Sequence, residues 1–504
     1  MISRVKSFTF ERTTPIGEGI LAMKYRSVLL ASLLLVTISC ASKSTLPIEE
    51  EVFRFEANSG DSVEAYRGSF IVPENRADPA SRMITLHYVR FPATGERPGA
   101  PIVYLAGGPG GSGIGTAKRQ RFPLFMAMRA FGDVIAFDQR GTGASNDLPR
   151  CISKTVIPAD QALTDDAYVA LHRETIAKCQ SFWELEGIDL AGYTTEESAK
   201  DLDALRAHLK ADKISLWGIS YGSHLALAAL KQMEDRIDRL VLASAEGLAQ
   251  TVKLPTRTDA YFVRLQEAIN TQPKAGAIFP DIKALFTRVY TKLEENPVML
   301  TVPQADGGTA QVLLQASLLK QFAAGSISDP SRAAQILGLY AAIDADFYDP
   351  VIGVLQAVYD PTEPISWDPM ALAMDIASGI ESTRLAQVNQ QAQSAILGDW
   401  LNFPMPHLYD VLPDITLDSS FRNGPNSSVP TLLLSGTLDG RTYPESQREA
   451  VAGLSNVQIV TVTNAGHNLF MSSPEVTKTI NAFMRGEALQ ANEIIIPLPD
   501  FAPF

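Results

Sequence analysis

A serine between two glycines constrains the fold of this 504-residue chain more than any other feature. Ser220 lies in the run Gly218–Gly222, which follows the apolar segment 213–217 and precedes the apolar segment 223–230. This order predicts a strand, a sharp strained turn and a helix, and a Cβ at either glycine would clash where strand and helix pack closely. The helix would direct its unpaired N–H groups and positive dipole end at the turn, where an oxyanion could form, so the pattern predicts a nucleophilic serine.

Several other short apolar runs end in glycine-rich or polar loops, as buried parallel strands do. These runs are 101–105, 133–137, 213–217, 239–243, 431–434 and 457–462. Helical stretches separate them, most clearly Thr194–Lys210, which a Thr194/Glu197 capping box would open. The alternation predicts an α/β fold with a doubly wound, mostly parallel sheet. Two earlier segments, 66–72 and 83–91, alternate as antiparallel strands do.

The strand pattern stops between residues 247 and 429. Helix-like segments and prolines fill this stretch, and its end, 403–429, is rich in Pro, Asp, Ser and Asn. We therefore expect a helical cap domain with a return loop over 247–429, inserted into a core formed by 50–246 and 430–504. A chain of this length exceeds what one compact core accommodates, which agrees with an insertion.

The first 40 residues have the pattern of an export signal. A basic start at Met23 precedes a short apolar run and small residues that end at Cys40. The run is too short to span a bilayer. Cysteine at this point is typical of bacterial lipoprotein signals, which predicts lipidation of Cys40, and the alternative is an ordinary signal peptide cleaved nearby. We expect an exported protein, periplasmic or anchored at the outer membrane, whose true start is Met23.

Export would place the other two cysteines in an oxidising compartment. Cys151 and Cys179 lie in the same stretch of the chain, so a disulfide between them is the natural interpretation. Two buried free thiols are the alternative. No cluster of Cys and His has the spacing of metal ligands, and the sequence implies no cofactor. The net charge of −13 argues against nucleic-acid binding, which requires a basic surface.

A serine nucleophile needs a base, and the base needs an orienting acid. His467 directly follows the strand predicted at 457–462, at the carboxyl edge of the sheet. Asp439 lies in the loop after the strand at 431–434, between Ser220 and His467 in chain order. The rival acids Asp410, Asp414 and Asp418 precede that strand and fall at its wrong end. The remaining histidines, for which we expect structural or solvent-facing roles, are His87, His172, His208, His224 and His407.

An oxyanion would need two backbone donors. One is the N–H of Tyr221, the residue after the nucleophile. The loop 106–111 would supply the other, from Gly108 with Gly110 as an alternative, because Pro109 has no N–H. This loop is also compatible with phosphate binding, but no Lys-Ser/Thr pair follows it and Rossmann spacing is missing.

These motifs together resemble the proline iminopeptidase family of α/β-hydrolases, and more closely its secreted branch with a tripeptidyl-aminopeptidase-like C-terminal region. The matching pieces are 107–111, 138–145, 218–222, 434–439 and 465–467. The sequence departs from the family at Ala106, where histidine is common. The run 138–145 is architectural in such enzymes, its arginine bracing the floor of the site. The resemblance implies a serine aminopeptidase with the triad Ser220, His467 and Asp439, acting on short peptides.

An aminopeptidase also binds the ammonium group of its substrate. Glu246 follows the strand at 239–243 and could serve, although only its position indicates this and a solvated loop acid is the alternative.

Two other functions remain open. The same triad would suit a carboxylesterase, lipase or thioesterase, and a cell-envelope binding protein could use the fold without catalysis. The oligomeric state stays undetermined, and only the lipid on Cys40 would contact a membrane.

Overall fold

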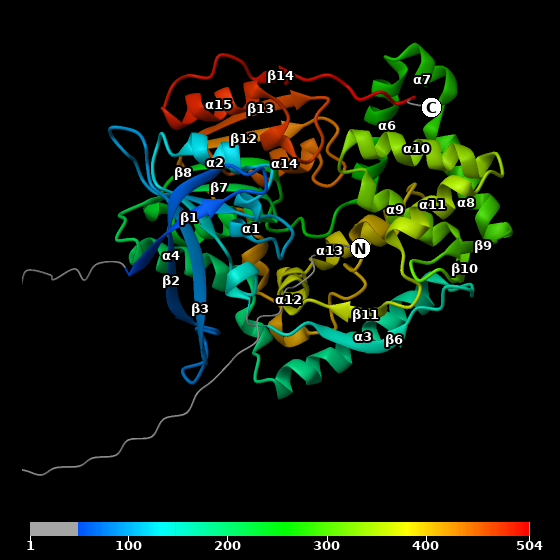
Figure 1. Cartoon of the computed structure of the whole chain (residues 1–504), viewed down its shortest axis with the longest axis horizontal. Coiled ribbons are helices and arrows are strands. Elements are labelled where there is room, and N and C mark those ends of the chain that lie inside the picture. The colour runs from blue at the N-terminus through cyan, green and yellow to red at the C-terminus, as the bar shows by residue number, and fades with distance from the viewer. Residues whose placement is uncertain (1–48, 147, 503–504) are drawn as a thin grey trace, which may run out of the picture. The chain divides into compact units, whose positions relative to one another are not determined.

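The computed structural model of the chain describes residues 49–146 and 148–502. Its central sheet places antiparallel strands at one edge and parallel strands through the rest (Figure 1). In spatial order the strands are β1 (Glu50–Glu56), β2 (Ser62–Pro73), β3 (Met83–Phe91), β5 (Val134–Phe137), β4 (Ile102–Leu105), β7 (Ile214–Ser220), β8 (Ile237–Ala245), β12 (Thr431–Gly436), β13 (Val457–Thr463) and β14 (Glu493–Ile495). The predicted α/β class with a mostly parallel sheet is confirmed.

Both faces of the sheet are covered, because successive residues of its strands enter different hydrophobic clusters. In β4, Val103 and Leu105 belong to one cluster, and Ile102 and Tyr104 belong to another. Helices contribute to each cluster as a doubly wound sheet requires. These helices are α1 (Gly113–Ala117), α2 (Phe122–Met128), α3 (Asp165–Leu185), α4 (Thr195–His208), α5 (Tyr221–Met233), α14 (Pro444–Ala450) and α15 (Pro474–Met484).

Helix α4 begins one residue later than predicted, with Thr194 as its N-cap. The Thr194 hydroxyl accepts a hydrogen bond from the Glu197 N–H at 3.3 Å, which is the first half of the capping box. The Glu197 carboxylate instead pairs with Arg76 and Lys200, each at 2.7 Å. A tertiary ion pair with Arg76 and a local one with Lys200 in the same helix therefore replace the second half of the box.

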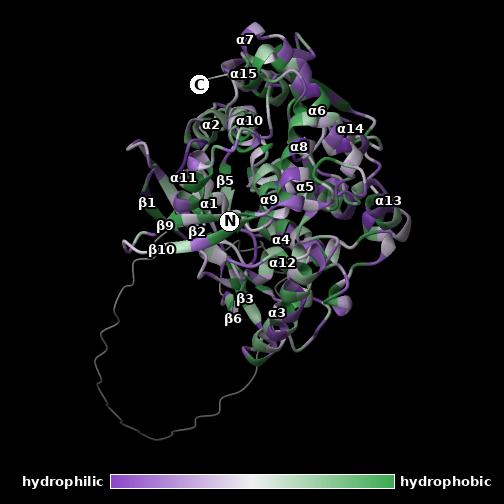
Figure 2. Ribbon diagram, turned by 90° about the vertical axis from the view of Figure 1, so that its right-hand side faces the viewer, coloured by the Kyte–Doolittle hydropathy of each residue, from purple (hydrophilic) through white to green (hydrophobic). Residues whose placement is uncertain are grey.

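Residues 247–429 are mainly helical. The helices are α6 (Pro255–Asn270), α7 (Pro273–Ile278), α8 (Ile282–Glu295), α9 (Ala316–Ser326), α10 (Pro330–Asp344), α11 (Asp349–Val358), α12 (Pro369–Ser378) and α13 (Ser382–Ala392). Helix α8 is an example, since it buries Ile282, Leu285, Val289 and Leu293 along one side. In Figure 2 the ribbon of the protein alternates between hydrophobic and hydrophilic colours. The described residues 49–146 and 148–502 belong to one compact unit, so the boundary between core and cap stays a prediction.

Three strands inside this region were not predicted. Strands β9 (Val298–Pro303) and β10 (Thr309–Leu314) form a hairpin, and β11 (Pro364–Trp367) pairs antiparallel with β6 (Cys151–Val156). The pairing of β11 with β6 connects two segments that are distant in sequence. Short two-stranded pairs depend on long-range neighbours, which the local pattern does not encode.

The predicted disulfide is present. Cys151 in β6 and Cys179 in α3 are bonded, with their Cα atoms 5.6 Å apart. Closing a loop of this size stabilises the folded chain by about 3.6 kcal/mol in the chain-entropy model. The export signal and Cys40 lie outside the described residues. None of the helices in the described part of the chain is both long and apolar enough to cross a membrane.

Candidate active site

Ser220 stands at the junction between β7 and α5. Its backbone has φ 55° and ψ −129°, a conformation that only a strongly constrained non-glycine residue adopts. A Cβ on Gly218 would lie 2.5 Å from the Gly222 carbonyl oxygen, and one on Gly222 would lie 2.1 Å from the Leu105 oxygen. Both contacts are with backbone, which side-chain motion cannot relieve. The close packing and strain predicted from the sequence are therefore present.

The glycine loop after β4 lies directly against this serine. A Cβ on Gly107 would come within 3.1 Å of the Ser220 Cβ. The next residue, Gly108, has φ +130°, which a residue with a side chain rarely adopts, and it precedes a cis proline. Gly107 accepts a hydrogen bond from the Gly111 N–H at 3.1 Å, which closes the loop. The backbone of this loop thus borders the serine, as an oxyanion site would require.

Asp439 and His467 come together at the ends of two neighbouring strands, β12 and β13. The Nδ1 atom of His467 lies 3.1 and 3.0 Å from the two carboxylate oxygens of Asp439. Asp439 is fully buried, whereas about a fifth of the His467 side chain is exposed. One side of the imidazole is therefore fixed by a buried acid while the other remains accessible.

The Asp439 carboxylate has four further donors. The backbone N–H groups of Arg441 and Thr442 donate to Oδ1 at 2.8 and 2.9 Å. The Thr442 hydroxyl and the Gln447 amide donate to Oδ2 at 2.8 and 3.3 Å. Burial alone would raise the pKa of Asp439, but the charge of His467 and these hydrogen bonds hold the pKa below its usual range. The acid therefore stays ionised beside the imidazole.

Ser220 and His467 are linked through strand β8. Ser220 pairs with Ala245, and the hydroxyl of the preceding Ser244 donates to the carbonyl of His467 at 2.7 Å. Within residues 49–146 and 148–502 the Ser220 hydroxyl forms no hydrogen bond. Contacts between nucleophile and base commonly tighten only when substrate binds. The structure thus brings all three predicted residues to one edge of the sheet, with Asp439 and His467 already in contact.

The other histidines have structural surroundings. His224 lies fully buried along α5, where its Nδ1 is 3.2 Å from the Gly247 carbonyl oxygen. His172 is buried among aromatic rings that include Trp367 and Phe403. His407 pairs with Asp399 at 3.1 Å. These contacts agree with the structural roles expected for them.

Arg140 confirms the architectural role expected of the run 138–145. Its guanidinium is fully buried and contacts the Asp201 carboxylate at 2.7 Å. It also donates to the carbonyl oxygens of Glu74 and Gly192. The arginine therefore ties the residue after β2, the turn before α4, helix α4 and the loop after β5 together.

Glu246 is not a solvated loop acid, since only 8% of the residue is exposed. Its carboxylate forms an ion pair with Lys253 at 2.8 Å. It lies close enough to Tyr221 and Asp375 to influence both of their pKa values. Glu246 is therefore a buried acid directly after β8, with one cation already beside it.

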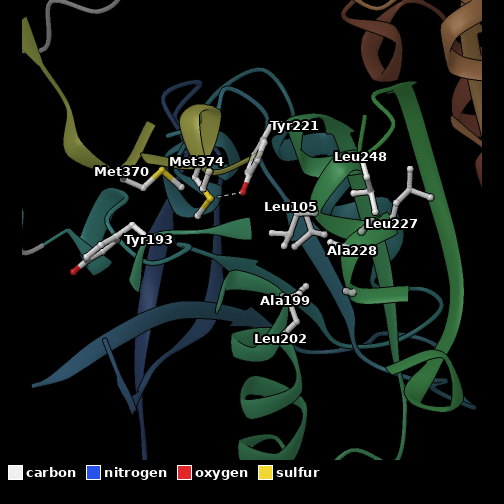
Figure 3. Close-up of a cluster of buried hydrophobic side chains, with 14 of the residues drawn as sticks. Leu105, Tyr193, Ala199, Leu202, Tyr221, Leu227, Ala228, Leu248, Met370 and Met374 are labelled. Atoms are coloured by element: carbon white, nitrogen blue, oxygen red, sulfur yellow. Dashed lines mark hydrogen bonds between the residues drawn. The ribbon is translucent and has the colours of Figure 1, made fainter. Parts of the chain in front are cut away.

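Asp375 is a further candidate carboxylate that sequence analysis did not find. It lies in α12, whose Met374 sulfur accepts a hydrogen bond from the Tyr221 hydroxyl at 2.9 Å (Figure 3). Ala371, one turn earlier, borders Gly110 of the glycine loop. In the described part of the chain the Asp375 carboxylate has no hydrogen bond or ion pair. Burial and the charge of Glu246 raise its pKa to about 7.

The sequence contains one weak signal for Asp375. It is the only acid within the otherwise apolar segment 369–378, and a charged residue in such a helix needs a reason. Thr442 and Gln447 were missed for another reason, because polar residues near a strand-end loop are common and only the fold shows that they contact Asp439.

The fold and the site together define a class of protein. The family model described as alpha/beta hydrolase fold matches residues 100–474, which is most of the chain. The chain therefore belongs to the alpha/beta hydrolase fold family, as the sequence motifs predicted.

Its relatives include serine peptidases. The serine protease Hip1 of Mycobacterium tuberculosis (strain ATCC 25618 / H37Rv) is 31% identical over 309 residues, covering 58% of this chain and 53% of Hip1. The tripeptidyl aminopeptidase of Streptomyces lividans is 31% identical over 190 residues, covering 35% of this chain and 34% of that enzyme. The aligned part of this chain thus spans about half of Hip1 and about a third of the tripeptidyl aminopeptidase. The predicted resemblance to this group of enzymes is confirmed.

Solved structures also align with this chain. The proline iminopeptidase of Mycobacterium smegmatis covers 83% of this chain with 98% of its own, at 15% identity and a TM-score of 0.34.

Proposed function

We propose that this protein is an exported serine aminopeptidase that releases N-terminal residues from short peptides. The proposal depends above all on the contact between Asp439 and His467 at the sheet edge that also carries the strained Ser220. Relatives named as serine protease and tripeptidyl aminopeptidase support peptides as the substrate class. Export rests on the signal pattern of the first 40 residues, with Cys40 as the candidate lipid attachment.

In the proposed reaction the Ser220 oxygen attacks the scissile carbonyl while His467 Nε2 takes the hydroxyl proton. The oxyanion would bind the N–H of Tyr221 and that of Gly108. His467 then passes the proton to the leaving amine, and an acyl-enzyme on Ser220 remains. Water, activated by the same imidazole, hydrolyses the acyl-enzyme. Asp439 fixes the tautomer with the proton on Nδ1 and stabilises the imidazolium.

The free amino terminus of the substrate would bind beside Glu246 and Asp375. An ammonium group requires a carboxylate that is not already neutralised. Lys253 pairs with Glu246, whereas the Asp375 carboxylate has no ionic partner among the described residues and is partly exposed. Asp375 therefore binds the ammonium group together with Glu246. Its helix, α12, is held to Tyr221 by the hydrogen bond to Met374.

The test compares three substrate types with one protein preparation. They are peptide anilides with a free amino terminus, the same peptides acetylated at that terminus, and acyl nitrophenyl esters. We expect cleavage of the free peptides and little cleavage of the acetylated ones, and none by Ser220→Ala. Turnover of the esters alone would favour the esterase alternative. Failure of all three to react would favour a binding protein.

Replacing Asp375 by asparagine should reduce kcat/KM for free peptides about tenfold to a hundredfold at pH 8, since one charged hydrogen bond is lost. The pKa of about 7 means that the charged carboxylate forms as the pH rises through that value. The ratio of wild-type to Asp375→Asn activity should therefore increase from pH 6 to pH 8. The matched control is Asp368→Asn at the N-cap of the same helix. A ratio independent of pH, or equal losses with acetylated peptides, would contradict amine binding by Asp375.

A further inference from the structure

Both backbone polar groups of His467 are held by residues outside its own loop. Its N–H donates to the carbonyl of Ser328, in the turn between α9 and α10, at 2.8 Å. Its carbonyl accepts from the Ser244 hydroxyl at 2.7 Å and from the Leu469 N–H at 3.1 Å. The imidazole of His467 is therefore positioned through its main chain as well as through Asp439.

Ser244 occupies a bulge in β8. Ile219 pairs with Ala243 and Ser220 pairs with Ala245, so Ser244 is the extra residue opposite the nucleophile. Bulges of this kind are common beside active sites, where they redirect a side chain. Here the redirected side chain is the one that reaches the carbonyl of His467.

The backbone of Ser244 is unfavourable for serine. Its φ is 49°, in the left-handed region, where glycine would be less strained. The residue is also completely buried, so exposure to solvent does not explain a hydroxyl there. The polar contacts of the side chain therefore favour a role at His467 over a role in the strand itself.

We propose that Ser244 is a positioning residue, whose hydroxyl fixes His467 at the distance that proton transfer from Ser220 requires. This inference rests on the proposed function, because it assumes that His467 is the base. Small displacements of a reacting group cost large factors in rate. Loss of the hydroxyl should therefore lower kcat and leave substrate binding unchanged.

The test uses Ser244→Gly and Ser244→Ala. Glycine removes the hydroxyl and relieves the backbone strain, so the variant should fold as well as wild type. We expect kcat to fall about tenfold or more in both variants, with KM and the melting temperature of Ser244→Gly unchanged. The rate at which a fluorophosphonate labels Ser220 should fall in parallel. As a matched control, Lys210→Gly relieves a φ of 55° at an exposed position and should leave kcat unchanged.

Three results would overturn the inference. They are full kcat in both variants, loss of kcat in Ser244→Ala alone, and a fall in the melting temperature of Ser244→Gly with kcat preserved. The last two would assign the residue to backbone geometry or to stability. Wild-type protein in the same assays tests the proposed function separately. If wild type neither cleaves peptides nor takes up the label, the proposed function fails and this inference fails with it.

Discussion

Asp439→Asn is expected to lower kcat by about four orders of magnitude while the protein stays folded. Two backbone N–H groups donate to Oδ1, so the amide oxygen of asparagine must take that position. The amide nitrogen then replaces Oδ2, 3.0 Å from the His467 Nδ1. There it donates to Nδ1 and forces the ring proton onto Nε2, where the imidazole can no longer accept the proton of Ser220.

Steady-state kinetics on the best peptide substrate measures this loss. Asp410→Asn is the control, because Asp410 is a rival acid by chain order but forms an ion pair with Arg173 at 2.8 Å, away from the triad. Wild-type kcat is expected for that variant. If Asp439→Asn kept more than a tenth of the activity, the acid would have to be another residue.

Gly222→Ala is expected to destabilise the fold by about 3 kcal/mol or more and to abolish activity. The new Cβ would lie 2.1 Å from the Leu105 carbonyl oxygen, at the point where β4 leads into the glycine loop. Only separation of α5 from β4 can relieve that contact, and this movement would displace the oxyanion donors from Ser220. Urea unfolding and peptide turnover report the two effects.

Gly353→Ala provides the opposite case. Gly353 lies within α11 with no atom within 4 Å of a new Cβ, so alanine should stabilise the helix by about 0.5–1 kcal/mol. Equal stability of Gly222→Ala and wild type would show that β4 and α5 are not in close backbone contact at this point.

The sequence predicted those features that depend on local pattern. The nucleophile turn needs two glycines at fixed spacing, and buried parallel strands need short apolar runs, so Ser220 and the strands β4, β5, β7, β8, β12 and β13 could be placed. His467 and Asp439 followed because residues just after parallel strands share one edge of a sheet. Features that depend on long-range packing were missed.

Asp375 and Ser244 are examples of such features. Asp375 reaches the site only because α12 packs against Tyr221 and the glycine loop, and helix packing in an inserted region has no local signature. Ser244 matters because a bulge turns it toward His467, and bulges are not encoded by alternation of residue types. The sequence also favoured a solvated Glu246, since it gave no sign of the packing that buries this residue.

Labelling with a fluorophosphonate followed by peptide mapping tests most directly whether His467 and Asp439 activate Ser220. One labelled residue, Ser220, is expected in the wild-type protein. Labelling should be lost in Ser220→Ala and slowed at least a hundredfold in His467→Ala, because the serine is unreactive without its base. A wild-type protein that takes up no label, or takes it up on a different serine, would contradict activation of Ser220 by His467 and Asp439.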